Sequence, residues 1–218
     1  MNPVAVVSAF LSFCLLDTLF FYAKMEGRYY AVHAIHNAAI TVFTAPQVYQ
    51  TLTDFPHVQD LATPTIASEF IVALHVYHAV MYFRKLRFDD WLHHALMIGV
   101  ALPLGLCSPP GALMGYSLFF TTGLPGGLDY VLLTAVRNGW LESAVEKRTN
   151  AVIQVWIRSP GCVSFAAFVC AFLTSHPEAS RFYQIAALLT AVLNVWNGQY
   201  FAAQVVYDAG KRSIPNII

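Results

Sequence analysis

Histidine is the reactive residue type that recurs at short spacing in this sequence. Of its eight histidines, six fall in three closely spaced pairs. An imidazole accepts or donates a proton near neutral pH and can itself take up an acyl group, so such pairs suit acid–base or acyl-transfer chemistry. In two pairs the spacing is three residues, which places both rings on one face of a helix. The pairs are His33 and His36, His75 and His78, and His93 and His94.

The chain that must position these histidines is too apolar for an ordinary soluble domain. It is 57% hydrophobic and only 11% charged, whereas a soluble domain carries about a quarter charged residues. Lipid must therefore cover part of its surface, and we predict an all-α integral membrane protein. A net charge of zero argues against a nucleic-acid partner.

Seven stretches predict about seven transmembrane helices, since one span needs roughly 20 mostly apolar residues. The second stretch is amphipathic, and Pro103 would kink the short fourth one. No basic residue precedes the first stretch and no cleavage-site pattern follows it, so we expect a retained helix rather than a signal peptide. The stretches are residues 3–23, 29–51, 66–84, 91–107, 112–136, 151–174 and 182–206.

The charges of the connecting loops agree with the seven-span count. With the N-terminus outside, ten of the twelve Lys and Arg residues fall on one side, and basic loops favour the cytoplasm. The last stretch contains no lysine for a Schiff base, which excludes a retinal protein. The scattered cysteines, Cys14, Cys107, Cys162 and Cys170, are expected to be small buried hydrophobes rather than disulfides or metal ligands.

The paired histidines fall in the cytoplasmic half of the predicted helices, which indicates a polar chamber open toward that side. Simpler interpretations stand beside this one. His33 and His36 suit interfacial or hydrogen-bonded positions, Asp90 suits a helix cap, and the Arg158 side chain could extend to the interface. Asp17 in the first stretch is expected to face another helix.

Residues 123–130 read Gly-Leu-Pro-Gly-Gly-Leu-Asp-Tyr, an unusual composition for a spanning helix. Glycine and proline allow close helix packing at a kink. Alternatively, they form an unwound turn that lines the chamber and directs Asp129 into it. Both interpretations are open from the sequence.

These features together resemble the TLC domain family, which includes the ceramide synthases and several non-enzymatic proteins. The resemblance covers roughly residues 28–207. It begins at residues similar to the start of the family's first domain helix and continues in a motif of acidic residues followed by paired histidines. An acidic residue on the next helix completes it. The residues that carry the resemblance are Arg28, His33, Ala34, Lys85, Asp89, Asp90, His93, His94 and Asp129.

The resemblance implies six helices in a barrel around a cytoplasm-facing, lipid-accessible chamber. Residues 1–27 would add one N-terminal helix, and residues 208–218 a cytoplasmic tail. In ceramide synthases the paired histidines carry acyl transfer from coenzyme A to a sphingoid amine. The candidate catalytic residues implied here are His93, His94, Asp129 and Asp90. The candidate cofactor-binding residues are Arg158 and Asn197, and the candidate chamber-lining residues are His33, His36, His75 and His78.

The sequence also departs from the ceramide synthases. Those enzymes carry more acidic residues after the histidine pair than the lone Asp129 found here, and His75 and His78 occupy positions where an acidic residue is expected. Activity is therefore an open question, and sphingoid specificity is less supported than acyl transfer.

Four functions compete at this point. The first is a lipid-modifying enzyme that uses acyl-CoA as substrate, and the second is a non-catalytic protein that binds a membrane lipid. The third is an oxidoreductase with a histidine-ligated metal, against which stands the lack of an HxxHH motif. The fourth is a structural subunit that binds other membrane proteins. No cofactor or metal is firmly implied. The lack of a presequence makes the endoplasmic reticulum the default location, with mitochondrial and plastid membranes as alternatives.

Overall fold

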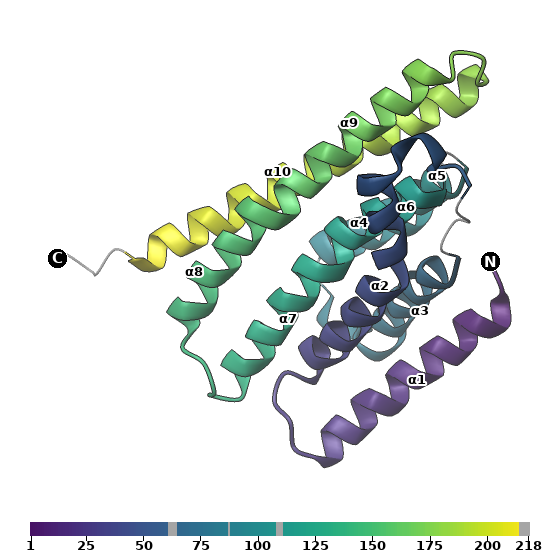
Figure 1. The fold of residues 1–218 in the computed structure, drawn as a ribbon. Helices are drawn as coiled ribbons and strands as arrows, with labels where there is room; N and C mark the ends of the chain where they lie inside the picture. Colours follow the sequence, from purple (N-terminus) through teal and green to yellow (C-terminus); the bar gives the residue numbers. More distant parts are fainter. Residues whose placement is uncertain (61–64, 87, 108–110, 214–218) are drawn as a thin grey trace.

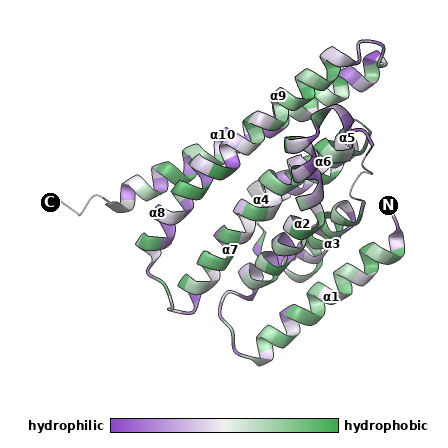
Figure 2. Cartoon of the chain, viewed as in Figure 1, coloured by the Kyte–Doolittle hydropathy of each residue, from purple (hydrophilic) through white to green (hydrophobic). Residues whose placement is uncertain are grey.

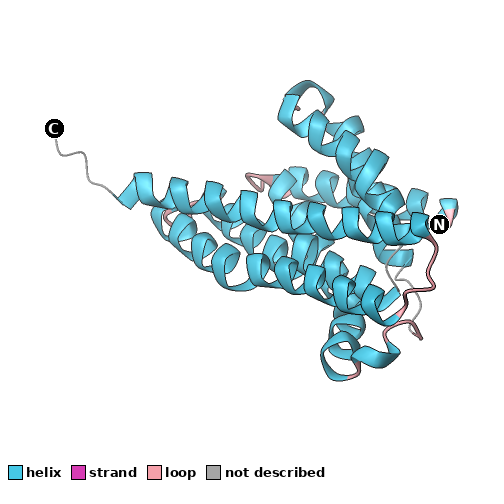
Figure 3. Cartoon of the chain, turned by 90° about the horizontal axis from the view of Figure 1, so that it is seen from above, coloured by secondary structure: helices cyan, strands magenta, loops and turns pink. Residues whose placement is uncertain are grey.

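The structure is a computed structural model that describes residues 1–60, 65–86, 88–107 and 111–213, without the side chains of residues 89, 90, 212 and 213. Helices joined by short loops make up these described residues, and no strand occurs among them (Figure 3). The prediction of an all-α fold is therefore confirmed.

The described residues form seven helical rods, three of which contain an internal π turn. The first two rods are α1 (Pro3–Tyr22) and α2 (Arg28–Thr53), and the third is α3 (Thr65–Met81). The fourth rod consists of α4 (Phe88–Leu96), the π turn η3 (Met97–Ala101) and α5 (Leu102–Cys107). The fifth consists of α6 (Gly111–Leu118), the π turn η4 (Phe119–Gly123) and α7 (Leu124–Arg137). The sixth consists of α8 (Ser143–Ile153), the π turn η5 (Gln154–Arg158) and α9 (Ser159–Ser175), and the seventh is α10 (Arg181–Ser213). Short 3-10 turns, η1 (Phe55–His57) and η2 (Phe83–Lys85), follow α2 and α3.

These rods coincide with the seven predicted stretches to within a few residues, apart from a longer seventh rod and an earlier start of the sixth. Two of them, Pro3–Tyr22 and Ser143–Ser175, are long and apolar enough to cross a membrane. Thr65–Met81 and Trp91–Cys107 are shorter apolar helices. Figure 2 shows hydrophobic residues along most of α1. Whether all seven rods span a membrane stays a prediction.

The rods alternate in direction, so each lies antiparallel to the next (Figure 1). Packing contacts run from α3 to α2, from α2 to α7, from α7 to α8, from α8 to α10 and from α10 to α5. The helix α1 packs outside this series, mainly on α3. The ends that carry the basic loops meet at one end of the bundle, at the lower left in Figure 1. We call this the basic end.

Apolar side chains fill the half of the bundle away from the basic end. One cluster joins α6, α9 and α10 through Tyr116, Phe165 and Ala187, which are 3%, 0% and 1% exposed. A second joins α2, α3, α5 and α6 around Ile40 and Ile71. Buried polar side chains occur in both halves, and the buried histidines lie in the half nearer the basic end.

The Gly-Leu-Pro-Gly-Gly stretch is not an unwound turn. The π turn η4 passes directly into α7, and Pro125 occupies the first turn of that helix. A Cβ atom added at Gly126 would lie 2.6 Å from the Asn37 side chain of α2. Close helix packing is thus the correct interpretation, because only a residue without a side chain lets α7 approach α2 this closely.

The four cysteines form no disulfide. Cys162 is buried as expected and Cys14 is half-buried, but the expectation of burial is wrong for Cys107 and Cys170, which are exposed.

Gly161 offers a test of this close packing. A Cβ atom there would overlap the ring and Cβ of Phe120 in η4. We expect Gly161→Ala to lower the stability of the protein by roughly 1–3 kcal/mol, because overpacking forces neighbours out of their preferred rotamers. Thermal unfolding in detergent measures this, with Gly99→Ala as the control, since nothing lies within 4 Å of the added atom there. Equal melting temperatures for the two variants would contradict the packing described here.

Candidate functional site

Five histidines from three helices form one continuous series of ring contacts, which we call the histidine cluster. His33 of α2 stacks on His78 of α3, with ring centroids 4.4 Å apart and planes 14° apart. The His78 ring lies 5.2 Å from that of His94 in α4, which lies 4.9 Å from His75. His93 stacks on His75 at 5.7 Å. The structure therefore brings together the pair on α3, the pair on α4 and one member of the pair on α2.

His36 is not part of this series. Its ring meets Phe13 of α1 edge-on at 5.7 Å, and its Nδ1 lies 2.7 Å from Oδ1 of the neighbouring Asn37. It is 1% exposed. His36 therefore packs between helices, which fits the hydrogen-bonded interpretation of this residue better than a lining role.

Imidazole rings hold α4 to α3. The backbones of α3 and α4 make few close approaches, although their histidines contact one another. At the start of α4, Trp91 adds an edge contact to Phe83 at 5.7 Å. Aromatic rings thus occupy the region of the predicted chamber. Two surface hollows, of about 430 and 230 Å³, lie elsewhere, where α9 ends and α10 begins.

Backbone carbonyls determine which ring nitrogen carries the proton in two members of the cluster. His33 Nδ1 lies 2.6 Å from the carbonyl oxygen of Tyr29, and His75 Nδ1 lies 2.7 Å from that of Ile71. A carbonyl oxygen only accepts, so each Nδ1 is the protonated, donating nitrogen. With a neutral ring, Nε2 then presents a lone pair, and neither Nε2 has a hydrogen-bond partner. In His78, which is 5% exposed, both ring nitrogens lack one.

The rings are packed too closely for several to be charged at once. Two imidazolium ions at the 4.4 Å separation of His33 and His78 would repel strongly in a buried site. No carboxylate with a described side chain forms an ion pair with either ring. His33 and His78 are therefore not both charged, and a neutral ring in this stack can accept a proton or a hydrogen bond.

Tyrosine rings pack on the His33–His78 part of the cluster, and their role is not evident from the sequence. Tyr29 lies 4.0 Å from His33 and 5.0 Å from His78, and Tyr130 of α7 lies 4.4 Å from His33. Tyr29 stands one helical turn before His33, a spacing that could have revealed it. Tyr130 belongs to a distant helix, so sequence spacing gives no signal for it.

Asp129 does not join the histidine pair of α4. Its Oδ1 accepts a hydrogen bond of 2.7 Å from Asn150 Nδ2 on α8, and Asn150 Oδ1 accepts one of 3.1 Å from Gln154 Nε2. Arg158 lies on the same rod and donates from Nη2 to Asn197 Oδ1 of α10 at 2.8 Å. The candidate residues therefore divide into the histidine cluster and a second group, which we call the amide group. Its members are Asp129, Glu146, Asn150, Gln154, Arg158 and Asn197.

The remaining acidic candidate cannot be placed. Asp90 lies in the first turn of α4, but the side chains of Asp89 and Asp90 fall outside the described residues. The predicted role of Asp90 in orienting an imidazole stays a prediction.

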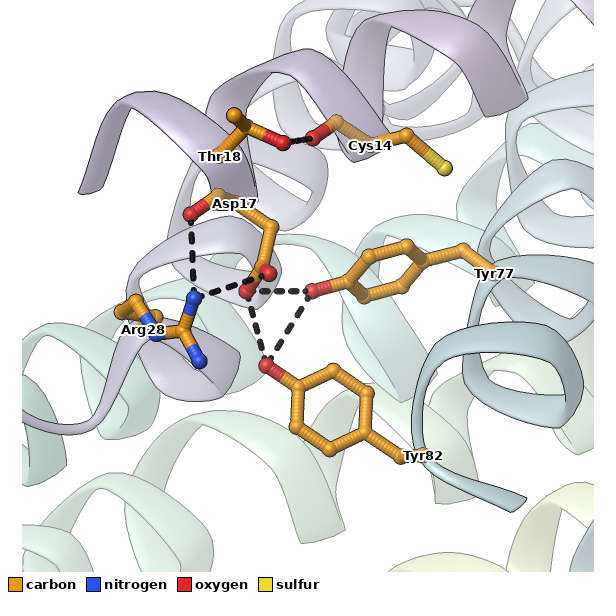
Figure 4. Close-up of polar contacts among 6 residues, drawn as sticks. All are labelled: Cys14, Asp17, Thr18, Arg28, Tyr77 and Tyr82. Atoms are coloured by element: carbon orange, nitrogen blue, oxygen red, sulfur yellow. Dashed lines mark hydrogen bonds and ion pairs between the residues drawn. The ribbon is translucent and has the colours of Figure 1, made fainter. Parts of the chain in front are cut away.

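A third polar group anchors α1 beside the cluster (Figure 4). Asp17, 3% exposed, accepts hydrogen bonds from the hydroxyl groups of Tyr77 at 3.0 Å and Tyr82 at 2.7 Å. Arg28 Nη1 lies 3.2 Å from its other oxygen. Gly27, at φ 66°, adopts the left-handed conformation that makes the turn into α2 and brings Arg28 back toward α1. Asp17 faces another helix, as expected.

The histidine cluster was also compared with the requirements of a metal-binding site. Among the described residues, no three His, Cys, Asp or Glu side chains converge in a way that could hold a metal ion. Outside the rods, exposed His57 lies 2.7 Å from Asp54, whose hydrogen bond raises the pKa of His57 above its ordinary value. His57 and His176 lie apart from the cluster and provide matched controls for histidine substitutions.

Comparison of the chain with protein-family models, with curated proteins and with solved structures finds no match. The resemblance to the TLC family therefore rests on the sequence motif alone.

Replacing Asp17 tests the anchoring of α1. We expect Asp17→Leu to lower stability by roughly 1–3 kcal/mol, because it leaves two buried hydroxyls and a guanidinium without their acceptor. Asp17→Asn keeps one acceptor oxygen for the two tyrosines and should fall between wild type and Asp17→Leu. Denaturant unfolding in detergent measures both variants. If Asp17→Leu proved as stable as the wild type, this group would not be what holds α1 in place.

Proposed function

We propose that this chain is an integral membrane protein that binds a lipid, with the polar head of the lipid at the histidine cluster. Support for the membrane comes from the two rods long and apolar enough to cross one. It also comes from the apolar side chains that α1 presents outward, among them Val4, Leu11 and Leu15, which are 71%, 58% and 60% exposed. Lipid tails would cover such a surface at no cost in unsatisfied polar groups.

The observation that carries the proposal is the set of buried imidazole nitrogens without partners. His33, His75 and His78 all have such nitrogens, whereas most buried polar groups in proteins are paired. Leaving a buried acceptor unsatisfied costs about 1–3 kcal/mol. A ligand that supplies hydrogen bonds to these nitrogens therefore binds where the protein gains most from it.

The proton positions define the chemistry of this ligand. Nε2 of His33 and Nε2 of His75 are acceptors, so the head group must donate. Lipid hydroxyl and amino groups donate hydrogen bonds, whereas esters and ionised phosphodiesters only accept. His78 can serve as donor or acceptor, because neither of its nitrogens is committed to a protein group. We therefore expect a lipid with a free hydroxyl or amine.

Lipid retention tests the proposal. We expect mass spectrometry of the purified protein to detect a co-purified hydroxyl- or amine-bearing lipid. His33→Ala/His78→Ala should retain about tenfold less of it, since the loss of two hydrogen bonds amounts to roughly 1.4 kcal/mol or more. His57→Ala/His176→Ala, with the same number of histidines removed, should retain it fully. Equal retention by both double variants would refute binding at the cluster.

Acyl transfer is a second candidate, favoured by the position of His93 and His94. His93 is exposed near the basic end and contacts His75, so it connects the surface with the buried rings. In such a reaction a neutral imidazole removes the proton from the lipid amine or hydroxyl as that group attacks the thioester carbonyl of acyl-CoA. The carbon–sulfur bond then breaks, and the thiolate of coenzyme A leaves and takes up the proton.

Turnover of acyl-CoA against lipid amines and alcohols tests this activity. We expect release of free coenzyme A that falls at least about a hundredfold in His93→Ala/His94→Ala, the usual size of a general-base contribution. The His57→Ala/His176→Ala variant should keep wild-type turnover. If a folded wild-type protein with bound lipid turns over no acyl-CoA across the panel, the function is lipid binding without catalysis.

A further inference from the structure

The amide group contains a row of polar side chains inside the helix bundle, where apolar side chains usually pack. Glu146 and Asn150 of α8 and Gln154, the first residue of η5, recur every fourth residue and so share one face of the sixth rod. All three are buried, at 1%, 3% and 1% exposed. The rod that carries them packs on α7 and α10. This face therefore lies inside the bundle rather than toward lipid.

The row is only partly satisfied by the protein. Glu146 Oε1, Gln154 Oε1 and Arg158 Nε are buried and have no hydrogen-bond partner. Two of these atoms accept and the third donates. Whatever completes the row must therefore donate to two positions and accept at the third.

A single ion does not meet this requirement. Glu146 and Gln154 are eight residues apart, which is roughly 12 Å along a helix, so one ion cannot bind both. A cation at Gln154 would also be repelled by Arg158, about one helical turn further along, while an anion at Arg158 would be repelled by Asp129. Water both donates and accepts, and several molecules can follow one another along the row.

The row begins at the basic end and leads toward the histidine cluster. Lys147 lies at its outer end, with Nζ 3.4 Å from Glu146 Oε2 and a side chain 20% exposed. Further in, Asn150 binds Asp129, and the next residue on α7 is Tyr130, whose ring packs on His33. The deepest member, Arg158, lies in the π turn η5, a deviation that is frequent at functional sites.

We propose that this face of α8 and η5 lines a hydrated inlet, which leads water from the basic end past Asp129 to Arg158. It reaches the Tyr130 side of the histidine cluster, whereas the lipid in our proposed function reaches that cluster through the bilayer. The inlet rests on the membrane-spanning part of that function, but not on the lipid bound at the cluster, because it is argued from the amide group.

Single cysteines in lipid nanodiscs test the inlet. The four native cysteines are first replaced by alanine, and Gln154→Cys is then compared with Ile153→Cys and Val152→Cys. Ile153 is 7% exposed and Val152 59%, so these neighbours report a buried apolar position and an outward-facing apolar position. The probe is the silver ion, which is charged and small enough to follow water. After exposure to silver, the protein is unfolded in denaturant and treated with an alkylating reagent. Thiols that have bound silver are not alkylated, so the unalkylated fraction measures the reaction with silver.

We expect silver to react with Gln154→Cys at least about tenfold faster than with either neighbour, because only a hydrated path admits an ion to that depth. Size-exclusion chromatography and thermal unfolding show whether each variant is folded. If Gln154→Cys does not fold, Arg158→Cys takes its place, since it lies deeper on the same path. A folded variant that reacts no faster than Ile153→Cys overturns the proposal. Loss of lipid retention in the histidine variants bears on the proposed function and leaves this result unaffected.

Discussion

Ring packing among imidazoles is the interaction on which the candidate site depends. The histidines of α3 and α4 bridge a separation that their backbones do not close, and the His33–His78 stack joins α2 to the same group. Aromatic rings fill volume as large apolar side chains do, yet each imidazole also carries two polar nitrogens. The same contacts therefore build the fold and concentrate reactive groups. Replacing one of these histidines by phenylalanine would keep the ring packing but remove the polar nitrogens, and so would separate the structural role from the chemical one.

The polar groups of the candidate site lie on one side of a mainly apolar core. Away from the basic end, Phe165 and its neighbours form this apolar core. Toward the basic end, three polar groups lie side by side: the Asp17 group, the histidine cluster and the amide group. Tyr77 contacts both Asp17 and His78, and Tyr130 contacts His33 and directly follows Asp129 in the chain. Tyrosines thus separate and connect these groups, because a phenol offers one apolar face and one polar tip.

Much of this arrangement could be predicted from the sequence, and the reasons are local. Apolar length located the seven rods, and the spacing of His75 and His78 placed both on one helix face. Helix periodicity also holds the signal for Glu146, Asn150 and Gln154, which recur every four residues but were not recognised beside the more conspicuous charges.

The sequence could not predict which side chains of different helices contact one another. Asp129 was expected beside His93 and His94, but its partner is Asn150, because the rotation of α7 about its axis depends on Gly126 meeting Asn37. A contact between two distant segments leaves no trace in the spacing of either one. The same applies to Tyr130, whose importance comes only from the ring that it meets on α2.

The three π turns also affect how the sequence of this chain would align with the sequences of related proteins. A π turn closes its hydrogen bonds one residue later than an α-helix does, so each holds one residue more than the geometry around it requires. A chain with uninterrupted α-helices at the same places would present the same faces with one residue fewer in each of three rods. An ungapped alignment between the two would lose register at residues 97–101, 119–123 and 154–158. Shared ancestry would then be easier to see in the positions of the rods than in their sequences.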